Sequence, residues 1–226
     1  MLILAIDTSG RHGSVALCRG DGDSFETLQL VALEGGTYSA RLMPTIASLL
    51  ERNHFDKKNV DGLVVVSGPG SFTGLRVGLA TVKGLCEVLH KPLATVTMLE
   101  AVAIARGSEG QNVTAVLDAG RGEVYVSEYE TADGAARLMR EYIAKLADFA
   151  TKAKTLPGEL LTPDVAVAEY LKGANITVRT VPPVQADEVG RIGIRKLLAG
   201  DVADIASVDV NYIRRSDAEI FSAPKR

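Results

Sequence analysis

One stretch decides the fold: SGPGSFTGLRVGLATVKGL, residues 67–85. Directly before it lies Leu63–Val66, a continuous apolar run that is typical of a strand buried on both faces. The pattern from Gly74 to Leu89 predicts a helix. The stretch therefore predicts a buried strand, a short loop and a helix in direct succession, and the rest of the sequence is interpreted outward from it.

The loop between this strand and this helix is rich in glycine. Gly68 and Gly70 permit backbone angles that other residues resist, and Ser71 or Thr73 can cap the helix. The N–H groups and the dipole at the helix start would favour an anion. The spacing matches neither G-x-x-x-x-G-K-[ST] nor G-x-G-x-x-G, in which Thr73 replaces the third glycine. On physical grounds alone we favour a tight turn that only feeds a core helix.

Three glycines, Gly74, Gly78 and Gly84, lie inside the predicted helix. Each costs roughly 0.5–1 kcal/mol relative to alanine in a helix interior. Close approach of another backbone would explain them. That backbone can belong to the same domain or to a partner subunit, and the sequence leaves both open.

The remaining pattern predicts further strands and helices. Strands are expected at 2–6, 12–19, 25–33, 60–67, 113–117, 123–129 and 176–181, with a hairpin turn at 20–23. Helices are expected around Leu42, Ile46, Leu49 and Leu50, and over 143–153, 164–172 and 186–198. Pro44 should lie in the first turn of its helix or produce a kink. The sequence pattern of strands and helices becomes weaker after about residue 100, and this change predicts a domain boundary there.

Composition narrows the classes of function. The 226 residues carry a formal net charge of −3, and 46% are hydrophobic. A protein that binds nucleic acid alone usually has a basic face, which this balance does not suggest. Cys18 and Cys86 are expected to be reduced core thiols. The apolar N-terminus is too short for a signal peptide or membrane span, so we expect a cytoplasmic protein without membrane contact.

The stretch at 67–85 resembles the signature segment of the TsaB (YeaZ) family. Four other segments are similar to further parts of that family and occur in the same order: LAIDTS (4–9), ARLMP (40–44), LDAGRGEVY (117–125) and NYIRR (211–215). The resemblance implies an α/β fold of the actin/Hsp70/sugar-kinase (ASKHA) type, with two lobes that each contain a mixed β-sheet flanked by helices. We assign 1–100 to the N-terminal lobe and 101–226 to the C-terminal lobe, whose last segment can pack back on the first.

The same resemblance implies a function. It is that of a non-catalytic scaffold or activator subunit in the complex that forms N6-threonylcarbamoyladenosine next to the anticodon of tRNAs. TsaD, a catalytic paralogue, and the ATPase TsaE would be its partners, and tRNA would bind only through the complex. TsaD would dock on helices 38–53 and 74–89, and a homodimer would use the same face when TsaD is absent. The interface residues are then Tyr38, Leu42, Ile46, Leu49, Gly74, Val77, Gly78, Thr81 and Leu85.

The chain departs from the catalytic pattern of its paralogue. TsaD-type subunits hold a metal through two histidines four apart on one helix, and Met98 and Val102 stand at the corresponding positions here. We interpret both as core residues, and we expect no metal and no cofactor. His12, His54 and His90 are expected in turns or at the surface. Tyr38 stands where many members of the family carry a histidine.

An autonomous enzyme is the alternative: an ATP-dependent phosphotransferase or a metallopeptidase-like protein of the same fold. Asp7 and Ser9, after the first strand, would then complete a possible anion or nucleotide loop with Gly68, Gly70, Ser71 and Thr73. We favour instead a carboxylate of Asp7 that only caps its own turn. Asp118 and Glu123 could form an acid–base pair, but a charged hairpin turn is the interpretation that we favour.

Overall fold

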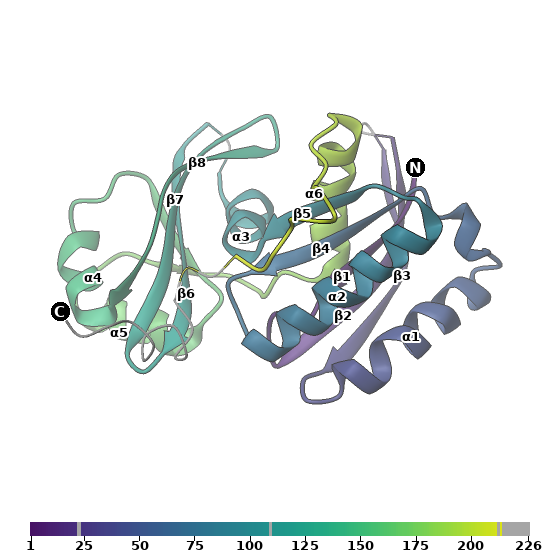
Figure 1. Ribbon diagram of the computed structural model, residues 1–226. Helices are drawn as coiled ribbons and strands as arrows, with labels where there is room; N and C mark the ends of the chain where they lie inside the picture. The colour runs from purple at the N-terminus through teal and green to yellow at the C-terminus, as the bar shows by residue number, and fades with distance from the viewer. Residues whose placement is uncertain (22–23, 109, 212, 214–226) are drawn as a thin grey trace.

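The computed structural model of the chain describes residues 1–21, 24–108, 110–211 and 213. It consists of two lobes, each built on a five-stranded mixed sheet with helices packed against it (Figure 1). This arrangement confirms the predicted fold class. Of the segments singled out in the sequence, Gly22 and Asp23 of the hairpin turn, and Tyr212, Arg214 and Arg215 of the NYIRR segment, lie outside the described residues.

The first sheet has the strand order β3-β2-β1-β4-β5. Its strands are β1 (Leu2–Asp7), β2 (His12–Gly20), β3 (Phe25–Glu34), β4 (Gly62–Gly68) and β5 (Leu93–Thr97). The first three form an antiparallel meander, and β4 and β5 run parallel to β1. Every residue of β4 is buried, as the apolar run at 63–66 predicts.

Helices cover both faces of this sheet. One face carries α1 (Tyr38–Arg52) and α2 (Phe72–Leu89), which lie side by side; the short helix η1 (Lys57–Asn59) follows α1 (Figure 1). The opposite face carries α6 (Ala186–Leu198). A Cβ at Gly193 of α6 would collide with Val64, so this glycine lets the helix lie directly on the sheet. The predicted helix 186–198 thus packs on the first sheet although it follows the second in sequence.

The second sheet has the strand order β10-β9-β6-β7-β8. Its strands are β6 (Asn112–Gly120), β7 (Glu123–Ala132), β8 (Ala135–Lys145), β9 (Glu159–Thr162) and β10 (Arg179–Thr180). One face packs on α4 (Leu146–Ala153) and α5 (Val165–Gly173). The other packs on α3 (Met98–Arg106), which lies between the two sheets and joins their cores (Figure 1).

Two ion pairs connect α3 with α6. The guanidinium of Arg106 donates two hydrogen bonds to the carboxylate of Glu188, one of them 2.9 Å long. Lys196 Nζ lies 2.8 Å from Glu100 Oε1 and also donates to the carbonyl of Thr95. Bidentate pairs of this kind fix orientation as well as contributing energy. The helix α6 is therefore fixed both to the first sheet and to the helix between the lobes.

The glycines of α2 have an internal explanation. Thr8, in the turn after β1, donates from Oγ1 to the carbonyl of Gly74 at 2.8 Å. A Cβ at Gly74 would collide with the backbone oxygen of Thr8, and one at Gly78 with its Oγ1. A Cβ at Gly84 would meet nothing within 4 Å. Two of the three glycines thus let α2 approach a turn of its own lobe, so a partner subunit is not needed to explain them.

The sequence missed or misplaced some elements. The strands β5 and β9, the helix α3 and most of the strand β8 were not predicted. The helix expected over 143–153 begins only at Leu146, because β8 continues to Lys145. As an edge strand with mostly exposed side chains, β8 lacks the clear alternation that marks a half-buried strand. Pro44 lies in the second turn of α1, not the first.

Within the described ranges, no helix has the length and apolar character that crossing a membrane requires.

The two environments of the α2 glycines predict opposite effects of alanine. We expect Gly78→Ala to lower the free energy of unfolding by about 1–3 kcal/mol, because the new methyl group forces Thr8 away from the helix. Gly84→Ala should raise it by about 0.5–1 kcal/mol, because the site is open and alanine favours the helix. Urea denaturation of both variants measures the difference. If Gly78→Ala were as stable as the unmodified chain, the close contact between position 78 and Thr8 would not require a glycine.

Candidate functional site

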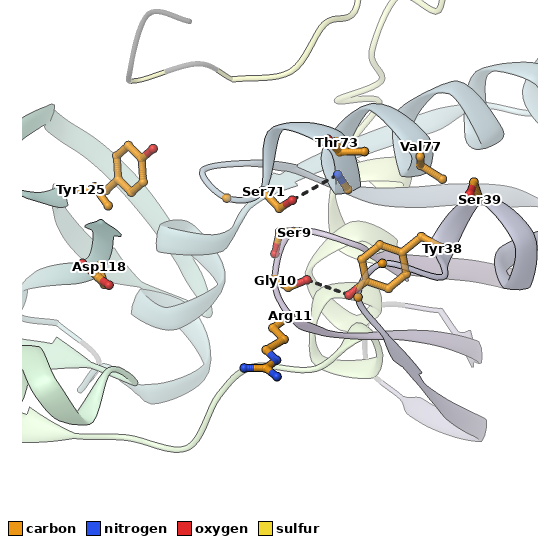
Figure 2. Close-up of a pocket in the computed structure, with 15 residues that line it drawn as sticks. Ser9, Gly10, Arg11, Tyr38, Ser39, Ser71, Thr73, Val77, Asp118 and Tyr125 are labelled. Atoms are coloured by element: carbon orange, nitrogen blue, oxygen red, sulfur yellow. Dashed lines mark hydrogen bonds between the residues drawn. The ribbon is translucent and has the colours of Figure 1, made fainter. Parts of the chain in front are cut away.

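A cleft of about 700 Å³ opens between the two lobes. Figure 2 shows its walls. The first lobe contributes the turn after β1, the start of α1 and the loop before α2, and the second lobe contributes residues of β6 and β7. The labelled lining residues are Ser9, Gly10, Arg11, Tyr38, Ser39, Ser71, Thr73, Val77, Asp118 and Tyr125. A cleft between two domains that is lined by apolar surface and a few polar groups is a common place for a binding site.

The loop before α2 is bound tightly to the turn after β1. Ser71 N donates to the carbonyl of Ser9 at 2.6 Å, and a Cβ at Gly70 would collide with that same carbonyl. Ser71 Oγ accepts from Gly74 N at 3.3 Å and so caps α2, as the sequence predicts. Of the possible anion loop, the structure brings Ser9, Gly70, Ser71 and Thr73 together at the cleft.

The other two members of that loop, Asp7 and Gly68, are buried and do not line the cleft. The Oδ1 atom of Asp7 accepts from Ser9 N at 2.8 Å and from Ser9 Oγ at 2.6 Å. Burial raises the pKa of Asp7 above its usual value, and the two bonds from Ser9 oppose that rise. The carboxylate therefore caps its own turn, which is the interpretation that the sequence favoured.

Tyr38 forms a fixed part of the cleft wall. Its hydroxyl donates to the carbonyl of Gly10 at 2.8 Å, and Figure 2 shows this bond. Burial and then the nearby Asp7 raise the pKa of Tyr38 to about 12, so the phenol stays protonated at neutral pH. The tyrosine thus connects the first turn of α1 with the turn after β1.

Charges of opposite sign line the two sides of the cleft. Arg11 lies beside the turn after β1, and Asp118 lies across from it on the second lobe (Figure 2). Asp118 Oδ1 accepts from Gly120 N at 2.9 Å, within a hairpin turn where Arg121 has a φ of 57°. This geometry supports the favoured interpretation of 118–123 as a charged turn. A polar ligand with an anionic group near Arg11 would match the cleft.

The sequence found only part of this cleft. It singled out Ser9, Gly70, Ser71 and Thr73 for an anion loop and considered Asp118 for acid–base chemistry, and it named the lining residues Tyr38, Gly74 and Val77 only for a partner face. It gave no signal for Arg11 or Tyr125 as members of a common site. These residues are far apart in the chain, and only the packing of the two lobes brings them to one cleft.

The positions of the paralogue's metal ligands do not fit a metal here. Met98 and Val102 are buried in the core around α3. A thioether and an isopropyl group are not ligands for a metal that prefers imidazole or carboxylate. Within the part of the chain that the structure describes, no group of three histidine, cysteine, aspartate or glutamate side chains is arranged to hold a metal ion.

The other titratable side chains that the sequence singled out are structural. His12, His54 and His90 are exposed; His54 and His90 have positive φ, as in turns. Cys18 and Cys86 are free and buried, as expected. Burial raises the pKa of the Cys18 thiol to about 12 and that of the Cys86 thiol to about 11, so neither is a thiolate at neutral pH.

The residues expected at a partner interface divide into two groups. Val77, Thr81 and Leu85 of α2 are half-buried and reach the surface. The others are buried inside the first lobe and hold α1 and α2 on the sheet: Tyr38, Leu42, Ile46, Leu49, Gly74 and Gly78. The exposed surface of this helix pair includes Met43 at 48% and Val88 at 72% exposure. Periodicity identified the apolar stripe correctly, but it cannot tell a stripe that faces a sheet from one that faces a partner.

Comparison with known proteins places the chain in a family. Residues 35–207 match the family described as TsaD: tRNA N6-adenosine threonylcarbamoyltransferase. The chain is 29% identical over 229 residues to "tRNA threonylcarbamoyladenosine biosynthesis protein TsaB" of Bacillus subtilis (strain 168), with 97% of this chain and 96% of that protein covered. It belongs to the TsaD family and to its TsaB (YeaZ) group. The predicted resemblance is confirmed.

Further relatives agree with this assignment. The TsaB protein of Escherichia coli (strain K12) is 34% identical over 134 residues, which cover 58% of this chain and 55% of that protein. Among solved structures, YeaZ from Pseudomonas aeruginosa aligns with a TM-score of 0.70 and 22% identity, covering 91% of this chain and 96% of that chain. Component A of (R)-2-hydroxyglutaryl-CoA dehydratase from Acidaminococcus fermentans aligns with a TM-score of 0.50, 12% identity and coverage of 88% and 99%. At these identities the structural likeness shows the fold alone, and it supports the ASKHA-type assignment.

The buried carboxyl of Asp7 predicts a pH dependence. A folded-state pKa raised above the ordinary 3.8 means that the folded state binds the proton more tightly than the unfolded state. The contribution of Asp7 to stability is thus largest below the unfolded pKa and is lost as the pH rises through the folded pKa. We expect the stability of the unmodified TsaB-type chain relative to Asp7→Asn to increase from about pH 7 to about pH 3, measured by urea denaturation.

Asp204 supplies a control of opposite sign. The hydrogen bond from the Ser207 hydroxyl is the largest of several causes that lower the pKa of Asp204. The contribution of Asp204 to stability is therefore present above the unfolded pKa and is lost as the pH falls through the folded pKa. The chain should therefore lose stability relative to Asp204→Asn over the same acid range. If the stability of the unmodified chain relative to each variant changed with pH in the same direction for both, the opposite pKa shifts assigned to Asp7 and Asp204 would be contradicted.

Proposed function

We propose that this TsaB-type chain is a non-catalytic subunit of the complex that forms N6-threonylcarbamoyladenosine on tRNA. Membership of a group whose relatives are named for that pathway supports the assignment to the process. One observation supports the non-catalytic role. Where the paralogue carries its metal-binding histidines, Met98 and Val102 are packed into the core around α3. Replacing buried apolar side chains by ligands would not create an open site, because the positions do not face the cleft.

The proposed partner face is the outer surface of α1 and α2. These helices lie side by side on the first sheet, with their buried stripes facing inward. Outward they expose Met43 and Val88 together with small residues such as Ala47 and Ala80. An apolar surface with small side chains suits close packing against a second pair of helices. TsaD, a member of the same family, is the partner that we propose for this face.

The remaining partners follow from this arrangement. TsaE would join the pair of TsaB and TsaD, and tRNA would be bound through the complex in the cytoplasm. The chain carries a net charge of −3, which is not the balance of a protein that grips tRNA alone. Without TsaD, we propose that two copies pair through the same face, because a self-complementary apolar patch can form a two-fold dimer.

A nucleotide-dependent enzyme is the second candidate, and the cleft is the observation that favours it. The starts of α1 and α2 both reach the cleft, where Arg11 also lies, so an anionic group could be accommodated there. Isothermal titration of the isolated chain with ATP and Mg²⁺ tests this function, together with an assay of ATP hydrolysis. Turnover by the isolated chain would contradict the non-catalytic proposal.

The partner face predicts a selective loss of binding. We expect Met43→Glu to weaken binding of the cognate TsaD subunit at least about tenfold, because a carboxylate would be buried without a partner. Surface plasmon resonance measures the dissociation constant. Leu138→Glu is the matched control: Leu138 is 50% exposed, but it lies on β8 of the second lobe, so binding should not change.

Two outcomes would contradict the assignment of this face. One is normal TsaD binding by Met43→Glu with its fold intact. The other is equal weakening by Leu138→Glu. Light scattering of the same two variants without TsaD tests the homodimer. Only Met43→Glu should lower the measured molecular mass from that of a dimer toward that of a monomer.

A further inference from the structure

The chain that follows α6 returns along the first lobe to the space between the lobes (Figure 1). On the way it is fixed at two points. Ala203 N donates to the carbonyl of Leu93 in β5 at 2.7 Å, and Lys83 Nζ of α2 donates to the carbonyl of Val208 at 3.0 Å. We call residues 203–211 the C-terminal strap. Its last residue begins the NYIRR segment, for which neither the partner face nor the cleft provides a role.

Asn211, at the end of the strap, bonds to both lobes. Its backbone N–H donates to the carbonyl of Ser67, at the end of β4 in the first lobe, at 2.8 Å. Its side-chain Nδ2 donates to Glu141 Oε2, on β8 in the second lobe, at 3.1 Å. A Cβ at Gly68 would lie 2.7 Å from the carbonyl oxygen of Asn211, so a glycine is needed there for the strap to pass. Asn211 thus joins the end of β4 to the second sheet.

The second-lobe anchor of Asn211 is itself fixed. The other carboxylate oxygen of Glu141 accepts from Ser127 Oγ at 2.9 Å, and Ser127 is fully buried and pairs with Glu141 across β7 and β8. Tyr125, two residues earlier on β7, lines the cleft. A hydrogen bond to a carboxylate is stronger than one between neutral groups. The position of Glu141 is therefore coupled to one wall of the cleft through a short length of paired strand.

The first-lobe anchor leads to the opposite wall. Ser67 and Gly68 end β4, and the chain continues directly to Gly70 and Ser71, which line the cleft and are bonded to the turn after β1. Both bonds of Asn211 therefore end within a few residues of a cleft wall. The apolar packing of α3 against both sheets holds the lobes together, and a longer contact of 3.4 Å joins Thr97 Oγ1 and Tyr129 OH nearby. Away from this end of β4, Arg195 of α6 also donates to the carbonyl of Gly134, in the turn between β7 and β8, at 2.8 Å.

We propose that Asn211 is a positioning residue that sets the angle between the lobes, and with it the opening of the cleft. It bonds to β4 through its backbone and to Glu141 through its amide. The apolar interface at α3 is tolerant of small rotations, because its contacts are not directional, whereas a hydrogen bond is. The inference concerns the cleft itself, so it does not depend on the proposed partner of the first lobe.

Exchanging donor and acceptor tests the bond between Asn211 and Glu141. Asn211→Asp keeps the shape and the backbone bond to Ser67 but places two carboxylates together, so the contact should break. Glu141→Gln alone keeps an acceptor for the amide of Asn211, so the contact should survive. In the double variant, Asn211→Asp with Glu141→Gln, the new amide donates to the new carboxylate and the contact should return.

The readout is the distance between the lobes. Nitroxide labels on Glu87→Cys in α2 and Ala166→Cys in α5 report it by pulsed electron paramagnetic resonance, because both positions are exposed. Cys18 and Cys86 are buried and stay unlabelled. Dilution with unlabelled chain removes distances between copies. We expect Asn211→Asp to broaden and shift the distribution, and Glu141→Gln and the double variant to give that of the unmodified chain.

Hydrogen exchange supplies a second readout at the cleft. The amides of residues 70–74 should exchange roughly five- to tenfold faster in Asn211→Asp, because the loss of one bond lowers the free energy of local opening. The double variant should reverse the change. Asn53→Asp is the matched control: Asn53 Nδ2 donates to Gln29 Oε1 at 2.7 Å inside the first lobe, so its loss should leave the interlobe distance unchanged.

An unchanged distance distribution in folded Asn211→Asp would overturn the proposal, and so would a double variant that folds but keeps the shifted distribution. If Asn211→Asp does not fold, Glu141→Ala removes the acceptor in the second lobe and leaves the strap intact. Its distance distribution should then shift, and an unshifted one contradicts the proposal equally.

Discussion

The contact between Thr8 and α2 is the constraint on which the first lobe depends. Thr8 donates to the carbonyl of Gly74, and its own backbone oxygen lies so close to the helix that a methyl group at Gly74 would not fit. This contact fixes the start of α2 relative to the turn after β1. Ser71 then reaches the carbonyl of Ser9, and one wall of the cleft follows. Two glycines that lower helix propensity thus permit the geometry of the site.

The second wall depends on α3, which packs against both sheets and is tied to α6 by Arg106–Glu188 and Lys196–Glu100. Because α6 also lies directly on the first sheet, it fixes the helix between the lobes to that sheet. The two sheets share one apolar core at α3, while polar bonds at Asn211 join them beside the cleft. Apolar packing gives cohesion, and the directional bonds give orientation.

The surfaces proposed for function are separate from one another. The outer side of α1 and α2, with Met43 and Val88, lies on the first lobe, whereas the cleft lies between the lobes. Met98 and Val102, which the resemblance matches to metal-binding positions of the paralogue, are core side chains. In our proposals these surfaces have different roles: the helix pair would hold a related subunit, and Asn211 would set the opening of the cleft.

Local patterns in the sequence were enough to predict the buried strand β4, a cap by Ser71 or Thr73 and the ends of α6, because each depends on an apolar run, a hydroxyl before a helix, or helical periodicity. The two-lobed α/β fold was predicted from the resemblance to the TsaB family. It also predicted that Met98 and Val102 are core residues, which their burial confirms. The tertiary structure was needed to show what the glycines of α2 approach, which side of α1 faces the sheet, that Arg11 and Tyr125 line one cleft, and that Asn211 bonds to both lobes. These facts depend on contacts between residues far apart in the chain, and one sequence carries no signal of which distant segments meet.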